Sequence, residues 1–396
     1  MKEIIINIDK QKNKTIMLVE NGNLIEKYIE NSEIKRLEGN IYIGKIQNVL
    51  QGMQAAFVDI GEEKNTFIHL KDMLPKLDTK TEDPEEIIQK SNIKEIAKPG
   101  MTVLVQVKRD STNKKGARVS THINLPGRFS VYMPNTNFIT ISQKIEDEKE
   151  RQRLMEIVQK NAPKNAGIIL RTSSIGKSEA EIVQDIKNLE KEWNKIKTSY
   201  KKSEEKAPTI LYKNSGIVKR ILIDLIDQNV GSITVNNKKQ YEEIKSILQE
   251  INPKIELILK TQESILDMYD LGTQLEKLNN RKIWLKCGGF ITIDKTEALT
   301  AIDVNSGKYI GTKNLEQTVY TVNKEASIEI AKQLRLRDIG GIVIIDYIDM
   351  KEEEHKHKII EVLKENLKKD RSKTQIIGFT QLNLLEMTRK HMCSND

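Results

Sequence analysis

Residues 288–307 read GGFITIDKTEALTAIDVNSG, and residues 339–350 read IGGIVIIDYIDM. Each stretch contains a mainly apolar run, Leu299–Ile302 or Gly341–Ile345, that ends at an aspartate. Residues 313–337 between them have helical periodicity, and their apolar face is expected to contain Leu315, Val319, Val322, Ala326 and Ile330. This order of strand, helix and strand predicts two parallel neighbouring strands joined by a crossover helix.

Asp303 and Asp346 are the aspartates that end these two runs. Equivalent ends of parallel neighbours lie side by side, about 4.8 Å apart, so the two carboxylates could converge. Carboxylates this close repel each other unless a cation neutralises them both. Mg²⁺ is the natural candidate, because it is a hard ion that one or two carboxylates bind while it keeps several waters. The spacing is therefore compatible with a site where a bound metal activates water against a phosphate.

Structural roles remain open for these polar residues. Aspartates at strand ends are common as turn formers and helix caps. Asn305 and Ser306 could orient a phosphate, or they could form a turn ahead of Gly307. Asp349 could lie behind the metal site, although we expect it to cap the helix predicted over residues 351–367.

The composition bounds the class of protein. A chain of 396 residues is longer than one hydrophobic core usually spans, and this length predicts roughly two to four domains. Its formal charge of +8 favours a polyanionic partner, although Lys-rich usage can also reflect an AT-rich genome. Cys287 and Cys393 lack Cys-x-x-Cys spacing, which argues against a zinc knot or a disulfide framework. No stretch approaches the roughly 18 apolar residues of a membrane span, so we expect a cytoplasmic protein with no membrane partner.

The first third of the chain is rich in strand patterns. Residues 4–9 (IIINID) and 15–22 (TIMLVENG) predict a small sheet, with a hairpin turn at Asn21-Gly22. From Gly39 to about Ile123, short strands punctuated by glycine predict a small barrel. Residues 78–98 are charged and poor in apolar residues, which favours a long surface loop or a short solvated helix.

Helical patterns dominate the middle of the chain, over residues 146–162 and 177–206. The second pattern has a core-facing stripe of Ile182, Ile186, Leu189, Trp193 and Ile196. A buried strand within GIILRTSS (167–174) separates the two helices, and the region is expected to form its own α/β unit. Residues 217–260 alternate helix and strand, as expected for parallel pairing, and residues 275–286 are expected to form a charged linker.

Five segments resemble signatures of the bacterial ribonuclease E/G family. They are TEALTAIDVNSGKYIG (296–311), NKEASIEIAKQLRLRDIGGIVIIDYIDM (323–350), LLEMTRK (384–390), GNIYIGKIQNVLQGMQAAFVDIGEEKNTFIHL (39–70) and GIILRTSSIGKS (167–178). The likeness spans nearly the whole chain, and on it the sequence is identified as a member of the family.

The resemblance implies a multidomain α/β fold. Its parts are a ribonuclease-H-like subdomain in two pieces (1–34 and 217–280), an inserted S-one type OB-fold RNA-binding domain (35–123), a 5′-sensor subdomain (124–216) and a DNase-I-like catalytic subdomain (281–396). The ribonuclease-H-like part is structural in the family, so Asp9 and Asp224 are expected to be ordinary surface acids.

An activity is also implied by the resemblance. Asp303 and Asp346 match the two Mg²⁺ ligands, with one ion per active site, and Asn305 matches the polar residue beside the first ligand. The implied reaction is hydrolysis of single-stranded, AU-rich RNA to a 5′-monophosphate and a 3′-hydroxyl, in rRNA and tRNA processing and mRNA decay.

RNA contacts are implied in the barrel and in the sensor. Phe57 and Phe67 match aromatics that stack on unpaired bases, and Lys115 matches a basic residue that contacts RNA. Without the resemblance, core packing would explain the two phenylalanines and simple solvation the lysine. The residues that match the sensor for a 5′-monophosphate are Gly127, Val131, Arg171 and Thr172. A surface salt bridge and a turn are the alternative for the last two.

The sequence departs from the family at several positions. Gln143 and Gln381 stand where some relatives carry arginine, which leaves the strength of the sensor open. The family continues into a Cys-x-x-Cys zinc link and a small dimerisation domain, whereas this chain stops at Asp396, and Cys393 has no partner cysteine nearby. No zinc site is therefore expected, and a homodimer or homotetramer is less well supported.

Two other classes of function were weighed against a nuclease. One is a non-catalytic RNA-binding or ribosome-associated protein that uses only the barrel and the sensor, and intact Asp303 and Asp346 argue against it. The other is a scaffold that recruits degradation enzymes, and the long disordered tail typical of such scaffolds is missing from this sequence.

Overall fold

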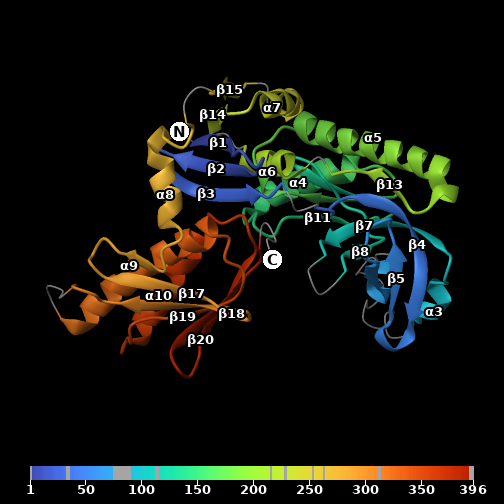
Figure 1. The fold of residues 1–396 in the computed structure, drawn as a ribbon. Helices are drawn as coiled ribbons and strands as arrows, with labels where there is room; N and C mark the ends of the chain where they lie inside the picture. The colour runs from blue at the N-terminus through green and yellow to red at the C-terminus, as the bar shows by residue number, and fades with distance from the viewer. Residues whose placement is uncertain are drawn as a thin grey trace. The chain divides into compact units, whose positions relative to one another are not determined.

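The computed structural model describes residues 2–32, 36–74, 91–111, 116–214, 216–226, 230–251, 254–261, 264–309 and 314–391. These residues form two compact units, Met1–Glu33 with Gln228–Asp396, and Ile34–Asp227 (Figure 1). Within the described ranges, no helix combines the length and the apolar character needed to span a lipid bilayer.

The first unit begins with a five-stranded sheet in the order β15-β14-β1-β2-β3. Its strands are β1 (Lys2–Ile8), β2 (Lys14–Glu20), β3 (Asn23–Glu30), β14 (Val230–Val235) and β15 (Glu256–Leu259). Asn21 and Gly22 have φ angles of 50° and 75°, the left-handed conformation that a tight hairpin turn requires. β14 runs parallel to both of its neighbours, and α7 (Lys238–Ile251) joins it to β15. The predicted hairpin and the predicted helix and strand alternation are confirmed.

A six-stranded sheet in the order β16-β17-β18-β19-β21-β20 forms the rest of this unit. Its strands are β16 (Lys282–Trp284), β17 (Phe290–Lys295), β18 (Leu299–Asn305), β19 (Gly341–Asp346), β20 (Thr374–Phe379) and β21 (Leu384–Arg389). β18 and β19 are parallel, and α9 (Leu315–Leu336) connects them. The crossover unit predicted from the sequence is therefore confirmed.

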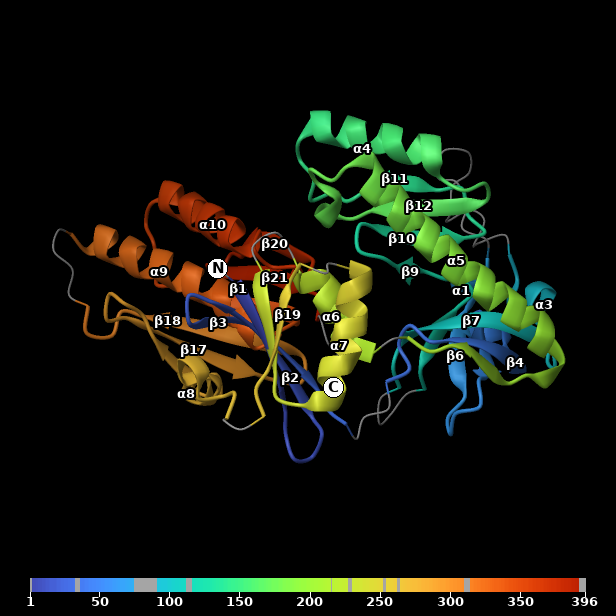
Figure 2. The ribbon, with the colours of Figure 1, turned by 90° about the horizontal axis from the view of Figure 1, so that it is seen from above.

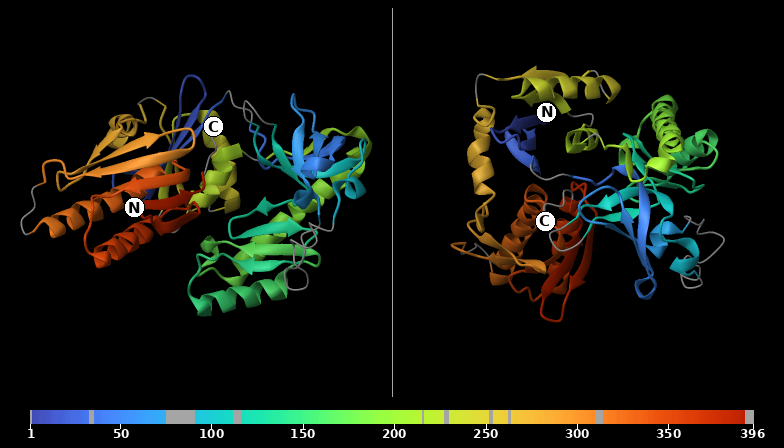
Figure 3. Two further views of the ribbon diagram at one scale, coloured as in Figure 1. Left: turned by 90° about the horizontal axis from the view of Figure 1, so that it is seen from below. Right: turned by 45° about the vertical axis from the view of Figure 1, so that its right-hand side comes forward.

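The two faces of this sheet differ in what covers them. Alternate residues such as Ile302, Val343 and Ile345 are buried in one core with the apolar side chains of α9 and α10 (Glu353–Leu367). The two helices lie side by side along that face (Figure 2; Figure 3, left). Of the residues that point the other way, Asp303 and Asp346 are exposed, and others such as Ile344 are half-buried. One face is therefore core and the opposite face is open.

Two predictions for this unit were wrong. Leu315 was expected on the apolar face of α9, but it is 75% exposed, because it is the first helical residue and lies beyond the sheet-facing stripe that begins at Val319. Residues 275–286 were expected to be a charged linker, but they contain the end of α8 (Leu271–Lys277) and the whole of β16. A three-residue edge strand is too short for its alternation to stand out among charged neighbours.

The second unit contains the predicted barrel. The barrel strands are β4 (Ile41–Leu50), β5 (Ala55–Asp59), β6 (Thr66–His69), β7 (Thr102–Arg109) and β8 (Arg118–Ser120). They pair in the order β4-β5-β6-β8-β7, and pairing of β7 with β4 closes the ring, as expected for an OB-fold. β13 (Thr209–Tyr212) adds to β4. Residues 78–90 of the predicted insertion (78–98) lie outside the described ranges, and α3 (Ile93–Ile96) buries Ile93 in the barrel core.

A four-stranded sheet in the order β11-β12-β10-β9 completes the second unit. Its strands are β9 (Leu125–Pro126), β10 (Ser130–Pro134), β11 (Ile139–Ile141) and β12 (Ala166–Leu170). α4 (Glu148–Asn161) and α5 (Glu179–Ser203) share one apolar core with it, and α5 contributes all five residues of the predicted stripe. α6 (Gly216–Leu225) ends the unit. The mixed α/β class is confirmed, and the finer subdomain layout stays a prediction.

Candidate active site

Strand register places Asp303 and Asp346 side by side. Asp303 on β18 is the direct partner of Asp346 on the parallel strand β19 and of Thr292 on the antiparallel strand β17. Register partners on neighbouring strands project to the same face, and neighbouring strands are about 4.8 Å apart. Both aspartates lie on the open face, so solvent and a ligand can reach them.

The electrostatics of this pair are those of two negative charges that share a small space. Burial raises the pKa of Asp346, and the charges of Asp303 and Asp349 raise it further. The amide Nδ2 of Asn305 donates a hydrogen bond to Oδ2 of Asp303 at 2.6 Å, which orients that carboxylate. Within the described ranges, neither Asp303 nor Asp346 forms an ion pair with a basic side chain. Arg281, which is already paired with Asp294, interacts with Asp303 through its charge and without an ion-pair contact.

Asp349 was expected to cap the helix that follows it, and this prediction was wrong. The first residue of α10 is Glu353, and the residue at its cap, Glu352, makes no side-chain capping bond. The backbone N–H groups of Lys351 and Glu352 instead donate to the carboxylate of Glu316 on α9. Asp349 is exposed and close enough to Asp346 to raise its pKa. It thus lies where the other expectation placed it, next to the acidic pair.

These donors fit a hard divalent cation. Two carboxylates from adjacent strand ends offer only oxygen ligands, and they leave room for water and for a phosphate oxygen. Burial first, and then the charges of Asp303 and Asp349, disfavour the ionised form of Asp346, and a bound cation would favour it. The roles of Asp303 and Asp346 as metal ligands, and of Asn305 beside them, stay predictions.

A second group of metal-binding residue types has a structural explanation. Atoms of Glu316, Glu352 and His355 lie within 4.8 Å of one another. However, Glu316 already accepts bonds from two backbone N–H groups at the start of α10 and contacts Nδ1 of His355 at 3.0 Å. The imidazole also stacks on Tyr320, with ring centroids 4.5 Å apart. These contacts join α9 to α10 and account for the cluster without a metal.

Phe57 and Phe67 are direct partners on the antiparallel barrel strands β5 and β6. Their rings meet edge to face, with centroids 6.1 Å apart, and both side chains are only half-buried. The pair is therefore partly accessible to solvent, and stacking on unpaired bases requires aromatic surface that a base can reach. Lys115, the third residue predicted to contact RNA, lies outside the described residues.

The predicted sensor residues converge around the start of β10 and the end of β12. The guanidinium of Arg171 donates to the backbone carbonyl of Gly127 at 2.9 Å. Thr172 begins a short 3-10 turn, and its hydroxyl lies 3.2 Å from that of Ser142. Val131 is half-buried on β10 and pairs with both β9 and β12. The structure therefore brings these residues together, and their role in phosphate sensing stays a prediction.

Asp185 on α5 organises the loop that precedes β10. Its carboxylate accepts hydrogen bonds of 2.9–3.1 Å from the backbone N–H groups of Arg128, Phe129 and Ser130, and a fourth of 2.7 Å from the Ser130 hydroxyl. A Cβ atom on Gly127 would lie 2.6 Å from a carboxylate oxygen of Asp185, so glycine is required at that position. No sequence motif predicts this role, because Asp185 is more than fifty residues from the loop that it binds.

Asp224 is not the ordinary surface acid that we expected. It lies on α6, and its carboxylate forms an ion pair with the guanidinium of Arg171. Only 20% of the Asp224 side chain and 29% of the Arg171 side chain are exposed. Asp9 does match the expectation, since it is exposed and only closes a turn with Asn13.

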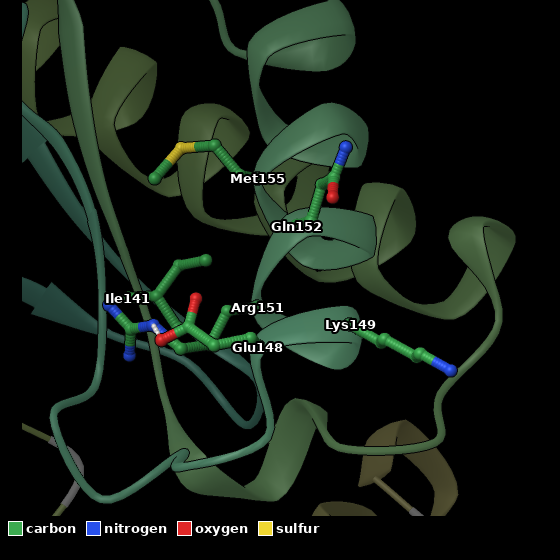
Figure 4. Close-up of a pocket in the computed structure, with 6 residues that line it drawn as sticks. All are labelled: Ile141, Glu148, Lys149, Arg151, Gln152 and Met155. Atoms are coloured by element: carbon green, nitrogen blue, oxygen red, sulfur yellow. Dashed lines mark ion pairs between the residues drawn. The ribbon is translucent and has the colours of Figure 1, made fainter.

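A surface hollow of about 330 Å³ lies between β11 and α4 (Figure 4). Its described lining consists of Ile141, Glu148, Lys149, Arg151, Gln152 and Met155, none of them predicted for catalysis or RNA binding. The guanidinium of Arg151 donates to the backbone carbonyls of Ser142 and Ile145. Its charge therefore stabilises the local backbone, and the hollow adds nothing to the candidate site.

Comparisons with known proteins find relatives along nearly the whole chain. A model of the ribonuclease E/G family matches residues 124–392. Ribonuclease G of Escherichia coli strain K12 is 37% identical over 391 residues, which cover 98% of this chain and 79% of the relative. Ribonuclease G of Haemophilus influenzae is 38% identical with the same coverage. Ribonuclease E of Nostoc sp. is 35% identical over 364 residues, which cover 90% of this chain and 52% of the relative.

Proposed function

Since this chain belongs to the ribonuclease E/G family, we infer that it is an endoribonuclease, a hydrolase that acts on phosphodiester bonds of RNA. We propose further that it requires Mg²⁺, cuts single-stranded AU-rich RNA, and leaves a 5′-monophosphate and a 3′-hydroxyl. The observation that carries the proposal is the register of Asp303 with Asp346 on the open face of the catalytic sheet. We also place the protein in the cytoplasm, in rRNA and tRNA processing and mRNA decay.

In this proposal Asp303 and Asp346 hold one Mg²⁺ ion, and Asn305 keeps the Asp303 carboxylate oriented through its amide. A bound Mg²⁺ would supply positive charge to the scissile phosphate and lower the pKa of a coordinated water. An extended strand can reach this sheet face, because Asp303 and Asp346 are exposed on it. These residues thus position the phosphate, and the 2′-hydroxyl of the RNA takes no part as a nucleophile.

RNA binding outside the catalytic face falls to the second unit. Phe57 and Phe67 would stack on unpaired bases, and Lys115 would contact the backbone. Arg171 and Thr172 would bind a 5′-monophosphate against the wall formed by Gly127 and Val131. A double helix cannot stack on these aromatics, because its bases already stack on one another.

The test is cleavage of an unstructured, AU-rich oligoribonucleotide that carries a 5′-monophosphate. We expect internal cuts that require Mg²⁺, and products whose new 5′ ends a 5′-phosphate-dependent exonuclease degrades. Asp303→Asn should lose turnover and still bind the oligonucleotide. A protein that binds the RNA but never cuts it with Mg²⁺ or Mn²⁺ would instead be the non-catalytic RNA-binding protein, and cutting by Asp303→Asn at the normal rate would remove the mechanism.

A further inference from the structure

Trp284 is an exposed indole on the sheet that carries the acidic pair. It lies on the edge strand β16, where 57% of its surface is exposed, whereas the other tryptophan of the chain, Trp193, is buried in a core with 4% exposed. Trp284 is the direct strand partner of Phe290 on β17. The two rings meet edge to face, with centroids 5.3 Å apart. A large aromatic side chain that stays exposed to solvent stabilises the fold little, and exposed apolar surface is typical of binding sites.

A lysine accompanies the two rings. The ammonium of Lys282 lies over both rings, 4.2 Å from the centroid of the Trp284 ring and 3.5 Å from the centroid of the Phe290 ring. This places a positive charge beside exposed aromatic surface, the combination that single-stranded nucleic acids bind through their bases and phosphates. We name Lys282, Trp284 and Phe290 the aromatic platform.

Strand register connects the aromatic platform to the acidic pair. Phe290 is the direct partner of Asn305, and Lys282 is separated from Asp303 only by Thr292, the residue that pairs with both. Residues in one register row project to one face, so the platform and the acidic pair share the open face of the sheet. Two strand spacings, about 10 Å, separate the row positions of Lys282 and Asp303.

We propose that the aromatic platform is a nucleobase-stacking subsite that holds one unpaired base of the RNA close to the scissile phosphate. This inference rests on the proposed function and adds to it a substrate contact within the catalytic sheet. An unpaired base has a free π-face for Trp284, and the phosphate that follows it carries the charge for Lys282. A base fixed here would hold the strand in place while its phosphate lies at Asp303 and Asp346.

Charge favours RNA over a second copy of the chain as the occupant. Lys282 supplies the positive charge at this edge, because the neighbouring guanidinium of Arg281 is already paired with Asp294. The whole chain has a formal charge of +8. A basic edge on a basic protein attracts a polyanion and repels its own copy.

The test measures binding in the Asp303→Asn background, which should hold RNA without cutting it. A single abasic nucleotide is moved stepwise along a short unstructured oligoribonucleotide across the known cut site. We expect one abasic position to weaken binding at least about fivefold, the effect of one lost stacking contact. In Trp284→Ala that position should lose its effect, and in Trp284→Phe most of it should remain. Ile328→Ala is the matched control, because it removes an exposed apolar side chain from α9 on the covered side of the sheet.

Tryptophan fluorescence supplies an independent readout. With Trp193 replaced by phenylalanine in the same background, the oligonucleotide should quench the emission of Trp284, and the abasic nucleotide at the sensitive position should reduce this quenching. The proposal is overturned if Trp284→Ala binds and cuts RNA like wild type, or if that substitution instead halves the mass in solution with RNA affinity unchanged. Cleavage by wild type with Mg²⁺ tests the proposed function, and the comparison of Trp284→Ala with that active wild type tests the stacking subsite. The two failures are therefore distinguishable.

Discussion

In the proposed function both the acidic pair of Asp303 and Asp346 and the guanidinium of Arg171 bind phosphate, yet the structure neutralises their charges to different degrees. Asp303 and Asp346 are direct neighbours, and in the described residues neither has a basic partner. Arg171 already has an ion-pair partner, Asp224, and a backbone acceptor at Gly127. The two aspartates therefore have no ion-pair partner among the described residues, whereas the charge of Arg171 is already balanced by Asp224 before a ligand binds.

This difference has an energetic consequence for each site. A cation at the acidic pair gains the attraction of two carboxylates and also removes their mutual repulsion. A terminal phosphate at Arg171 must replace or share a carboxylate that is already bound, so only the difference between the two interactions contributes to binding. The comparison predicts near-absolute dependence on the acidic pair and a modest effect of the sensor.

The largest expected effect is the loss of one of the two paired charges. Asp346→Asn keeps the size of the side chain but should lower turnover at least about a hundredfold, because metal charge stabilisation is worth several kcal/mol. RNA binding should change little. Glu297→Gln, an exposed acid at the opposite end of β18, is the control that should leave the rate unchanged. The measurement is the initial rate of RNA cleavage at saturating Mg²⁺. Equal losses of rate in Asp346→Asn and Glu297→Gln would contradict a specific role for the pair.

The sensor loop should be the next most sensitive feature. Asp185→Ala leaves three backbone N–H groups without their acceptor, and each costs about 1–3 kcal/mol where water cannot replace it. We expect a lower melting temperature and an approximately equal cutting rate for 5′-monophosphate and 5′-hydroxyl RNA. Gln184→Ala changes the adjacent exposed position of α5 and should preserve both properties. A 5′ preference that survives Asp185→Ala would show that the loop does not form the pocket.

The role of Asp185 could not be predicted from the sequence. The paired aspartates, the crossover helix and the closed barrel were predictable, because each depends on short-range periodicity and on strand order. The carboxylate of Asp185, the partner of Arg171 on α6 and the aromatic platform on β16 depend on which distant segments meet. Local sequence patterns do not predict contacts between distant segments. β16 has only three residues among charged neighbours, so its alternation could not be recognised. Resemblance to the family identified residue types, and the structure supplied their partners.

A smaller and more specific effect should come from pH. The pKa of Asp346 is raised by burial and by the charges of Asp303 and Asp349, so protons compete with Mg²⁺ at a higher pH than at an ordinary aspartate. Activity at limiting Mg²⁺ should therefore fall as pH falls through this raised pKa. Asp349→Asn removes one of the charges and should move the acid limb of the profile to lower pH by a fraction of a unit. An unmoved limb would mean that Asp346 does not titrate with metal binding.

The neutral sensor offers the opposite experiment, in which removal of a charge should improve binding. Asp224→Asn removes the internal competitor of the terminal phosphate, while the bond from Arg171 to the Gly127 carbonyl still orients the guanidinium. We expect the ratio of cutting rates for 5′-monophosphate and 5′-hydroxyl RNA to rise about two- to fivefold, the range of one partly exposed ion pair. Arg171→Gln should reduce this ratio to about one. A fall in the ratio for Asp224→Asn would instead assign Asp224 to holding Arg171 in place.

The smallest effect concerns the segment that follows the sensor arginine. Glu150 on α4 accepts hydrogen bonds from Arg153 and from the backbone N–H of Gly176, and these bonds lower its pKa to about 2 from the usual 4.5. Because the folded-state pKa is depressed, this stabilisation is fully present above about pH 4.5 and is lost as pH falls toward 2. Glu150→Gln should therefore lower the melting temperature slightly at pH 7, by the equivalent of about 0.5 kcal/mol, and the difference from wild type should shrink in acid. Melting curves at pH 7 and pH 3 compare the two proteins. The control is Glu156→Gln, which changes an exposed acid on the same helix that has no ion pair with a described residue. A difference that grows in acid would mean that Glu150 stabilises the fold through something other than its charge.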